Sequence, residues 1–184
     1  MRPDFVANHR RLAEPGWFVT GNRVLLSANL TMRVLAERLT PESWSFARWL
    51  AERWRGGVNR LSALLHLPLG PLRRIRQRVW QGARSCNLAI WRSDLNRVDG
   101  FDADYQGWGK EDSDIIVRLL HSGIRRKDGV FATGVLHLWH ADADRSRLSE
   151  NERKLAGVTA GDRIRAQRGL SSLQDTSAAA IAVS

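Results

Sequence analysis

Two adjacent carboxylates, Glu111 and Asp112, stand in the segment GWGKEDSD at 107–114, directly before an apolar run with helical spacing. Asp112 precedes the first two isoleucines by three and four residues, so it falls on the same helix face as the apolar residues. Its side chain is therefore predicted to point inward. A positioned carboxylate of this kind can take a proton from a hydroxyl nucleophile, as a general base does.

Asp114 is expected to behave differently, because Arg118 follows it by four residues. Opposite charges at this spacing pair along a helix surface, and we expect this pair on the solvent-facing side, where it contributes only ~0.3–0.5 kcal/mol. Glu111 and Asp112 also have a purely structural interpretation, as first-turn acids that satisfy free amides and the helix dipole. Taken alone, the two residues leave both interpretations open.

The acids cluster just upstream as well. Between residues 99 and 114 there are six acids and one base, a local net charge of −5, whereas the whole chain carries +10. The six acids are Asp99, Asp102, Asp104, Glu111, Asp112 and Asp114. A concentrated acidic patch in a basic protein suggests a site for a hydroxylated substrate or a metal.

A second cluster is LHLWH at 136–140, which ends the apolar run 130–135. The run is predicted to be a strand that ends near Ala141. In a strand His137 and His140 lie on opposite faces, but a turn after Leu138 would bring both imidazoles together. Two histidines alone are weak evidence for a metal, because zinc sites use three or four ligands and the only cysteine, Cys86, is distant in sequence. On these residues alone, a half-buried histidine bonded to a backbone carbonyl is favoured.

Four motifs occur together in a fixed order: CNLAIWR at 86–92, VDGFD at 98–102, GWGKEDSD at 107–114 and HLWH at 137–140. Their order and spacing resemble the C-terminal half of family 2 glycosyltransferases, and more narrowly the galactosyltransferase C-terminal subtype of the GT-A fold. The resemblance covers about residues 2–144. It implies an α/β chain with a partial GT-A-type nucleotide-diphospho-sugar transferase fold, helix-rich with a small mixed sheet.

The resemblance also implies residue roles. Asp112 matches the general base that takes the proton of the acceptor hydroxyl, and Glu111 matches a residue that orients the acceptor or the base. His137 matches a ligand of Mn²⁺ or Mg²⁺, with His140 as a second candidate. Residues at acceptor-binding positions are Trp108, Gly109, Asp114 and Asn87.

The implied activity is inverting transfer of a hexose from a nucleotide-diphospho-sugar to a glycan or lipid-linked acceptor, in cell-envelope polysaccharide or glycolipid synthesis. A sugar hydroxyl is a poor nucleophile, so a positioned base contributes roughly 10²–10⁴ in rate. A divalent cation that bridges the phosphates stabilises the charge of the departing group.

Relatives of this kind place an N-terminal half ending in an Asp-x-Asp motif just before the stretch matched here by residues 2–5. This sequence begins at Met1, so we expect acceptor and base machinery without the donor half. Such a chain is a truncated transferase, a fragment or half of a split enzyme, with or without activity of its own, or a non-catalytic remnant or partner subunit. Residues 1–168 are assigned to the half-domain and residues 169–184, rich in serine and alanine, to a disordered tail.

The predicted elements place the motifs on helix starts and strand ends. Helices are expected at 3–13, 27–39, 40–54, 58–65, 71–79 and 93–98 and after Asp112, with strands at 17–26, interrupted at 21–22, and at 85–91. The helix at 40–54 is expected to open with Thr40 as its cap followed by proline. The longest apolar stretches are too short to span a bilayer, and a cytoplasmic location, peripheral at the inner face of the cell membrane, is expected.

The insert at 41–84 is basic and rich in tryptophan. Residues 48–84 contain nine arginines and one acid, Glu52, for a net charge of +8. Such helices can lie on an anionic membrane surface. Equally, a core stripe would leave the arginines solvated, its members being Trp44, Ala47, Leu50, Ala51 and Trp54. A nucleic-acid binder is a competing class, disfavoured because the acidic patch repels a phosphate backbone.

Overall fold

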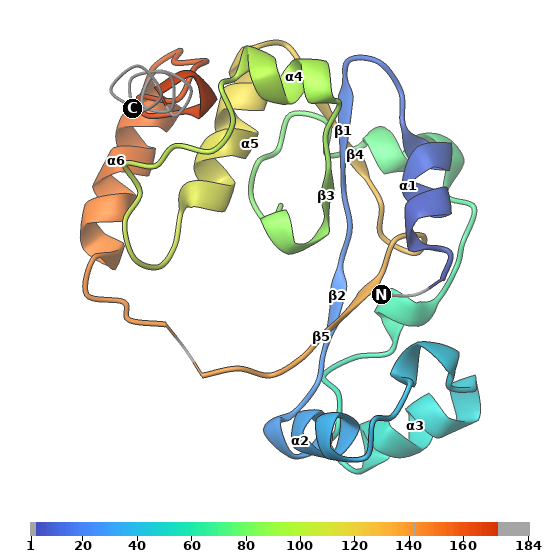
Figure 1. Cartoon of the computed structure of the whole chain (residues 1–184). Helices are drawn as coiled ribbons and strands as arrows, with labels where there is room; N and C mark the ends of the chain where they lie inside the picture. Colours follow the sequence, from blue (N-terminus) through green and yellow to red (C-terminus); the bar gives the residue numbers. More distant parts are fainter. Residues whose placement is uncertain (1–2, 142, 173–184) are drawn as a thin grey trace, which may run out of the picture.

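The computed structural model describes residues 3–141 and 143–172. It is a mixed α/β structure, and the predicted class, helix-rich with a small mixed sheet, is confirmed (Figure 1). The α-helices are α1 (Phe5–Leu12), α2 (Ala28–Ala36), α3 (Phe46–Trp54), α4 (Arg92–Arg97), α5 (Glu111–His121) and α6 (Leu148–Ala160). The strands are β1 (Trp17–Thr20), β2 (Arg23–Leu25), β3 (Leu88–Ala89), β4 (Arg125–Asp128) and β5 (Val135–His137). Four 3₁₀ turns are η1 (Pro41–Ser43), η2 (Ser62–Leu64), η3 (Gly70–Arg74) and η4 (Ser85–Asn87).

The strands form two small sheets. In the first, of order β3-β1-β4, β1 is antiparallel to β3 and parallel to β4. In the second, β2 pairs in parallel with β5. The predicted break at 21–22 separates β1 from β2, and it requires glycine, since a Cβ on Gly21 would lie 2.3 Å from both Asn87 Nδ2 and Thr133 Oγ1. The chain therefore runs from one sheet into the other through this crowded junction.

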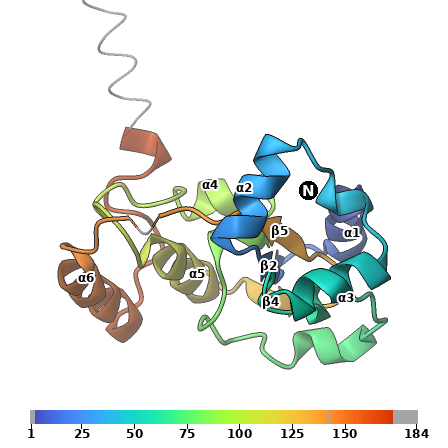
Figure 2. The same ribbon diagram turned by 90° about the horizontal axis from the view of Figure 1, so that it is seen from below.

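Two apolar clusters pack against these sheets. Phe18 of β1 packs with Ile115, Ile116 and Leu119 of α5 in the first cluster. The second cluster gathers Val24 of β2 with residues of α2 and α3. Figure 1 shows α5 on one side of β1 and α1 on the other, and in Figure 2 the same two helices lie on opposite sides of β2 and β4. The N-terminus of α5, which carries the candidate base, is thus supported by a fully buried helix face.

Helices α1, α2, α4 and α5 were predicted close to where they occur, and the Ser27 hydroxyl caps α2 by accepting from the Leu30 amide at 3.3 Å. The predicted start of the next helix is wrong. Pro41 opens only the turn η1, and α3 begins at Phe46, because the Ser45 hydroxyl accepts from the Arg48 amide at 3.3 Å. Serine provides the cap that the Thr40-proline pattern was expected to provide.

The predicted helices at 58–65 and 71–79 are also wrong. Those regions contain only η2 and η3, because tertiary contacts compete with helix formation: Val58 bridges to Leu26, and the Arg73 guanidinium donates to three backbone carbonyls, those of Leu67, Asp128 and Val130. A helix over 71–79 would pull Arg73 away from these acceptors.

The strand predictions were too long. In place of the strand predicted at 85–91, only Leu88–Ala89 form a strand, β3, because residues 85–87 form the turn η4. Most of 130–135 is a turn, in which the amides of Ala132 and Thr133 both donate to the Gly129 carbonyl and Phe131 has a φ of 59°. Strand β4 and helix α6 were not predicted. All four residues of β4 are charged, and two of them, Arg126 and Lys127, are buried because hydrogen bonds to other parts of the chain satisfy them.

Of the predicted tail, residues 173–184 lie outside the described residues. Its first residues are held in place: the Ser171 amide and hydroxyl donate to the two Asp99 carboxylate oxygens at 2.9 and 2.7 Å. Within the described parts of the chain, every helix is too short or too polar to cross a membrane.

Candidate active site

Helix α5 begins directly after a loop of unusual backbone conformation. Gly107, Gly109 and Lys110 have φ values of 72°, 98° and 79°, and Lys110, at the N-cap, provides no side-chain cap. Glu111 and Asp112 follow in the first turn, both half-buried. The loop thus delivers two carboxylates to a helix start whose amides and dipole favour negative charge.

One oxygen of the Asp112 carboxylate accepts a hydrogen bond, and the other has no hydrogen-bond partner in the described residues. The Ser85 amide donates to Asp112 Oδ2 at 3.0 Å, which ties Asp112 to η4. Asp112 Oδ1 and Glu111 Oε2 are buried side-chain oxygens without a hydrogen-bond partner in the described residues. A buried acceptor without a partner is costly in a stable fold and is typical of a site that meets a substrate donor.

The tryptophan loop is positioned by α6, a helix that was not predicted although Leu148, Leu155 and Val158 have helical spacing. Asn151 Nδ2 donates to the carbonyls of Gln106 and Trp108, at 3.0 and 3.4 Å. The Trp108 side chain is 39 % exposed, and the Arg145 guanidinium carbon lies 4.5 Å from its ring centroid. The exposed part of this indole can stack on a sugar face.

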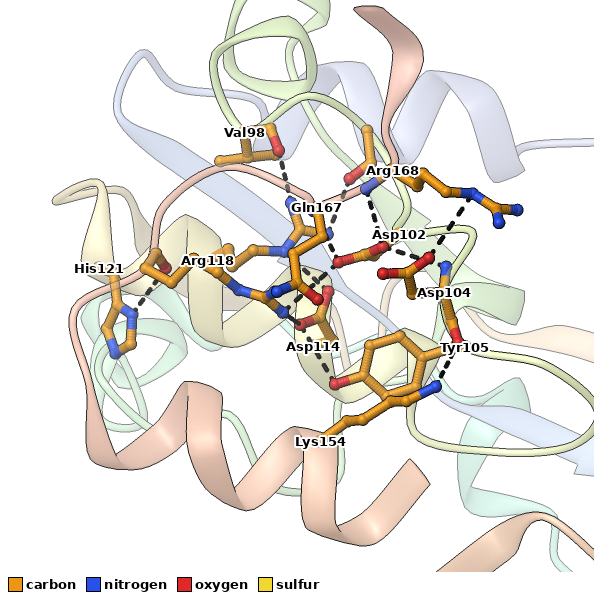
Figure 3. Close-up of polar contacts among 12 residues, drawn as sticks. Val98, Asp102, Asp104, Tyr105, Asp114, Arg118, His121, Lys154, Gln167 and Arg168 are labelled. Carbon is orange, nitrogen blue, oxygen red and sulfur yellow. Dashed lines mark hydrogen bonds and ion pairs between the residues drawn. The ribbon is translucent and has the colours of Figure 1, made fainter. Parts of the chain in front are cut away.

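The expected solvent-facing position of Asp114 is wrong. Both Asp114 and Arg118 are fully buried, and Arg118 Nε lies 2.7 Å from Asp114 Oδ2. The same guanidinium donates to the carbonyls of Val98 and Gly100, at 2.5 and 2.8 Å, and these bonds draw the pair into the core (Figure 3). An acceptor contact from Asp114 would require this network to open.

Further groups occupy the other Asp114 oxygen. Arg163 donates to Asp114 Oδ1 at 3.1 Å, and the Tyr105 hydroxyl lies 3.4 Å from it. Burial first, and then the charge of Asp114, raise the pKa of Tyr105, so this hydroxyl remains protonated and can donate. The network ties α5 to the acidic loop.

The acidic patch divides into two parts in space. Glu111 and Asp112 are held by few partners, whereas the C-terminal segment covers the upstream acids: Arg165 pairs with Asp99 at 3.2 Å and Arg163 with Asp102 at 3.5 Å. Burial would raise the pKa of Asp102, but amides of Gln167, Asp104 and Arg168 donate to it and bring its pKa below the ordinary value (Figure 3). These upstream acids hold the fold together around the site.

Asn87, predicted at an acceptor-binding position, is 1 % exposed and lies at a junction of the fold. Its amide nitrogen donates to the carbonyls of Asn22 and Thr133, and its oxygen lies 3.0 Å from His9 Nε2. These bonds join α1, the β1–β2 junction and the turn before β5. In this arrangement Asn87 supports the neighbouring Ser85 turn.

The two histidines adopt the turn alternative. Strand β5 ends at His137, and the rings of His137 and His140 have centroids 5.3 Å apart. Burial, followed by the charges of Arg23 and His140, lowers the pKa of His137, so its imidazole is neutral near pH 7 and its lone pair is free to bind a metal. No group of three or more ligand side chains that could hold a metal occurs in the described residues. The pair suits Mn²⁺ better than Mg²⁺, which prefers oxygen.

The histidines make stability dependent on pH. Burial lowers the pKa of His9, partly offset by its hydrogen bond with Asn87, and the pKa of His137 is lowered as well. Both values lie below the ordinary 6.5, so the unfolded chain takes up protons first as the pH falls. We therefore expect a thermal midpoint that is level above about pH 7 and decreases as the pH falls below about 6.5.

Thermal melts at constant ionic strength test this expectation, with His137→Asn as the variant that should lose part of the decrease. A second decrease is expected below about pH 4, where Asp99 and Asp102, whose pKa values are lowered in the fold, become protonated. A midpoint that rises between pH 7 and pH 5 would contradict the assignment.

Comparison with known proteins places part of this site in an established class. Residues 75–142, which include η4, the tryptophan loop, α5 and the histidine pair, match the family model described as the N-terminal domain of galactosyltransferase. The chain therefore contains a glycosyltransferase-type segment, and its mixed α/β structure is compatible with a partial glycosyltransferase fold. The galactosyltransferase resemblance predicted from the motifs is confirmed, although the motifs indicated the C-terminal subtype.

Among individual proteins, chondroitin sulfate synthase 3 of Homo sapiens and that of Mus musculus are each 43 % identical to this chain over 53 residues, covering 28 % of the chain. Chondroitin sulfate N-acetylgalactosaminyltransferase 1 of Homo sapiens is 35 % identical over 68 residues, covering 35 % of the chain. The matched parts amount to 6 % and 12 % of the length of these relatives. No solved structure matches the chain.

Proposed function

We propose that this chain serves in the transfer of a hexose from a nucleotide-diphospho-sugar to a hydroxyl of a glycan or lipid-linked acceptor, with Asp112 as general base. One observation carries the proposal. Within the glycosyltransferase-type segment, the Ser85 amide fixes one oxygen of Asp112, while the other oxygen is buried and has no hydrogen-bond partner in the described residues. Trp108 stands four residues before it with an exposed indole. A family 2, GT-A-type, inverting transferase would use this arrangement.

In the proposed reaction the acceptor hydroxyl oxygen attacks the anomeric carbon and forms the new glycosidic bond. The bond from that carbon to the diphosphate breaks, and the diphosphate leaves with the electron pair. Asp112 Oδ1 accepts the hydroxyl proton as the attack proceeds, and Glu111 orients the acceptor through its open Oε2. A single displacement of this kind inverts the anomeric configuration.

The experiment that tests this function is turnover of nucleotide-diphospho-hexoses by the full chain with Mn²⁺ present. The donor set should include the N-acetylgalactosaminyl donor, since one relative's name specifies that sugar, and both glycan and lipid-linked acceptors. A non-catalytic partner subunit is the second candidate. It is favoured because the described residues bring together only two candidate metal ligands at this site, His137 and His140. That candidate predicts acceptor binding without turnover of any donor.

Metal binding by the histidine pair can be measured independently of activity. We expect His137→Ala to weaken Mn²⁺ binding by at least about tenfold, because the described residues offer few replacement ligands. The signal of free Mn²⁺ in electron paramagnetic resonance reports the bound fraction directly. His66→Ala is the matched control, because His66 pairs with Asp4 outside the site. Equal Mn²⁺ affinity in the two variants would remove His137 from the metal site.

A further inference from the structure

Helix α3 presents an apolar stripe to solvent. Phe46, Leu50 and Trp54 recur at intervals of four residues and are 54 %, 43 % and 85 % exposed. The opposite side of the helix is the packed one, where Trp49 and Glu52 are 4 % and 3 % exposed. The core stripe predicted for this helix is therefore wrong in register, because Trp49 fills the space beside α2 while Trp54 points away from the core.

One of the positive charges on α3 accompanies this stripe. Arg48, Arg53 and Arg55, on the helix or at its end, are exposed, but the Arg48 guanidinium lies 4.1 Å over the Trp44 ring and Arg55 Nη1 lies 3.7 Å from Glu52 Oε1. The one acid of the helix, Glu52, is buried and lies 2.5 Å from Arg33 Nη2. At 100° per residue, Arg53 borders the stripe beside Phe46. The solvent-facing surface of α3 is thus apolar and cationic, without an acidic side chain.

The neighbouring helix α2 extends this character. Met32 and Leu35 are 59 % and 62 % exposed. Figure 1 shows α2 and α3 together at one end of the molecule, away from α5 and α6. Among the described residues of α2, η1 and α3 and the segments that join them, the exposed acids are Glu37, just after α2, and Glu42 in η1. Five large apolar side chains on two adjacent helices are more than isolated exposed residues, and such groups mark interaction surfaces.

We propose that this end of the molecule binds an anionic lipid surface through α3. Phe46, Leu50 and Trp54 would enter the boundary between headgroups and acyl chains, and Arg53, which borders the stripe, would contact lipid phosphates. A second copy of the chain fits less well, because a symmetric pairing of this face would bring the arginines of both copies together. Lipid binding does not depend on the transfer reaction, and it would hold the chain at the inner face of the cell membrane, where lipid-linked acceptors are found.

The test is flotation of the full chain with phosphatidylcholine vesicles, with and without phosphatidylglycerol. We expect binding to the anionic vesicles only, weakened by salt. The triple variant Phe46→Ser, Leu50→Ser, Trp54→Ser should bind at least about tenfold less. Its thermal midpoint should stay close to that of the parent chain, because the three side chains are exposed.

A matched control replaces exposed apolar residues elsewhere, Val6→Ser and Ile75→Ser, and should bind vesicles as the parent does. The variant Arg53→Gln should weaken the preference for anionic lipid. The proposal is overturned if anionic vesicles do not bind the chain or bind the triple variant equally. It is also overturned if the triple variant instead abolishes self-association or binding to duplex DNA.

Discussion

Asp112→Asn should lower the turnover number for sugar transfer by roughly 10²–10⁴, the contribution of a positioned general base. Asparagine has the same shape, and its side-chain oxygen can still accept the Ser85 amide that now donates to Asp112 Oδ2 at 3.0 Å. What the variant loses is the ability to accept a proton. The fold and the binding of donor and acceptor should therefore change little while the chemical step fails.

The measurement is steady-state transfer by the full chain, with thermal melts to compare folding. Asp162→Asn is the control, because Asp162 is an exposed carboxylate outside the loop and α5. Transfer should be unaffected by the control, and the loss with Asp112→Asn should appear in the turnover number with the Michaelis constant nearly unchanged. Retention of more than about a tenth of the parent rate would contradict the assignment of Asp112 as the general base.

Arg118→Met should lower the free energy of unfolding by about 3–5 kcal/mol, because it removes one partner of a buried ion pair. Asp114 would keep Arg163 and Tyr105, but the carbonyls of Val98 and Gly100 would lose the donors that now lie 2.5 and 2.8 Å away. Methionine fills most of the volume, so the effect reports the charge and the hydrogen bonds.

Urea unfolding followed by circular dichroism measures this change. Arg78→Met removes the same charge from an exposed position and should alter the free energy of unfolding by less than about 0.5 kcal/mol. The double variant Arg118→Met, Asp114→Leu is not expected to recover the parent stability, because the Gly100 carbonyl still loses its guanidinium donor and the Val98 carbonyl keeps only the Ala166 amide, at 3.1 Å. A loss below about 1 kcal/mol for Arg118→Met would mean that water replaces the guanidinium bonds.

Much of the local organisation could be predicted from sequence, because the signals are short-range. The Ser27 cap, the break at Gly21 and the helix after Glu111 each depend on residue types within one or two turns of the chain. The order of the four motifs, which led to the glycosyltransferase resemblance, is likewise a property of the sequence that needs no tertiary structure. The weakest predictions were the helices at 58–65 and 71–79, where Val58 and Arg73 bond to distant backbone.

The acids in the first turn of α5 show which features could be predicted from the sequence and which could not. Their helical spacing correctly placed Glu111 and Asp112 at the start of α5, yet it assigned Asp114 to solvent on the assumption that an acid–arginine pair four residues apart is a surface pair. Only the tertiary structure brings the Val98 and Gly100 carbonyls and Arg163 to that pair, and these partners make its burial favourable.

The same division holds for the whole chain. Sequence by itself determined the residue types, their periodicity and the motif spacing, and through these the glycosyltransferase resemblance of residues 75–142 and the candidate base. Only the tertiary structure decided that Glu111 and Asp112 each have a buried oxygen without a hydrogen-bond partner in the described residues. It also decided that the Trp108 indole is partly exposed. Those outcomes depend on contacts between residues far apart in the chain, such as Ser85 with Asp112 and the C-terminal arginines with the acidic loop, and local sequence does not encode such contacts.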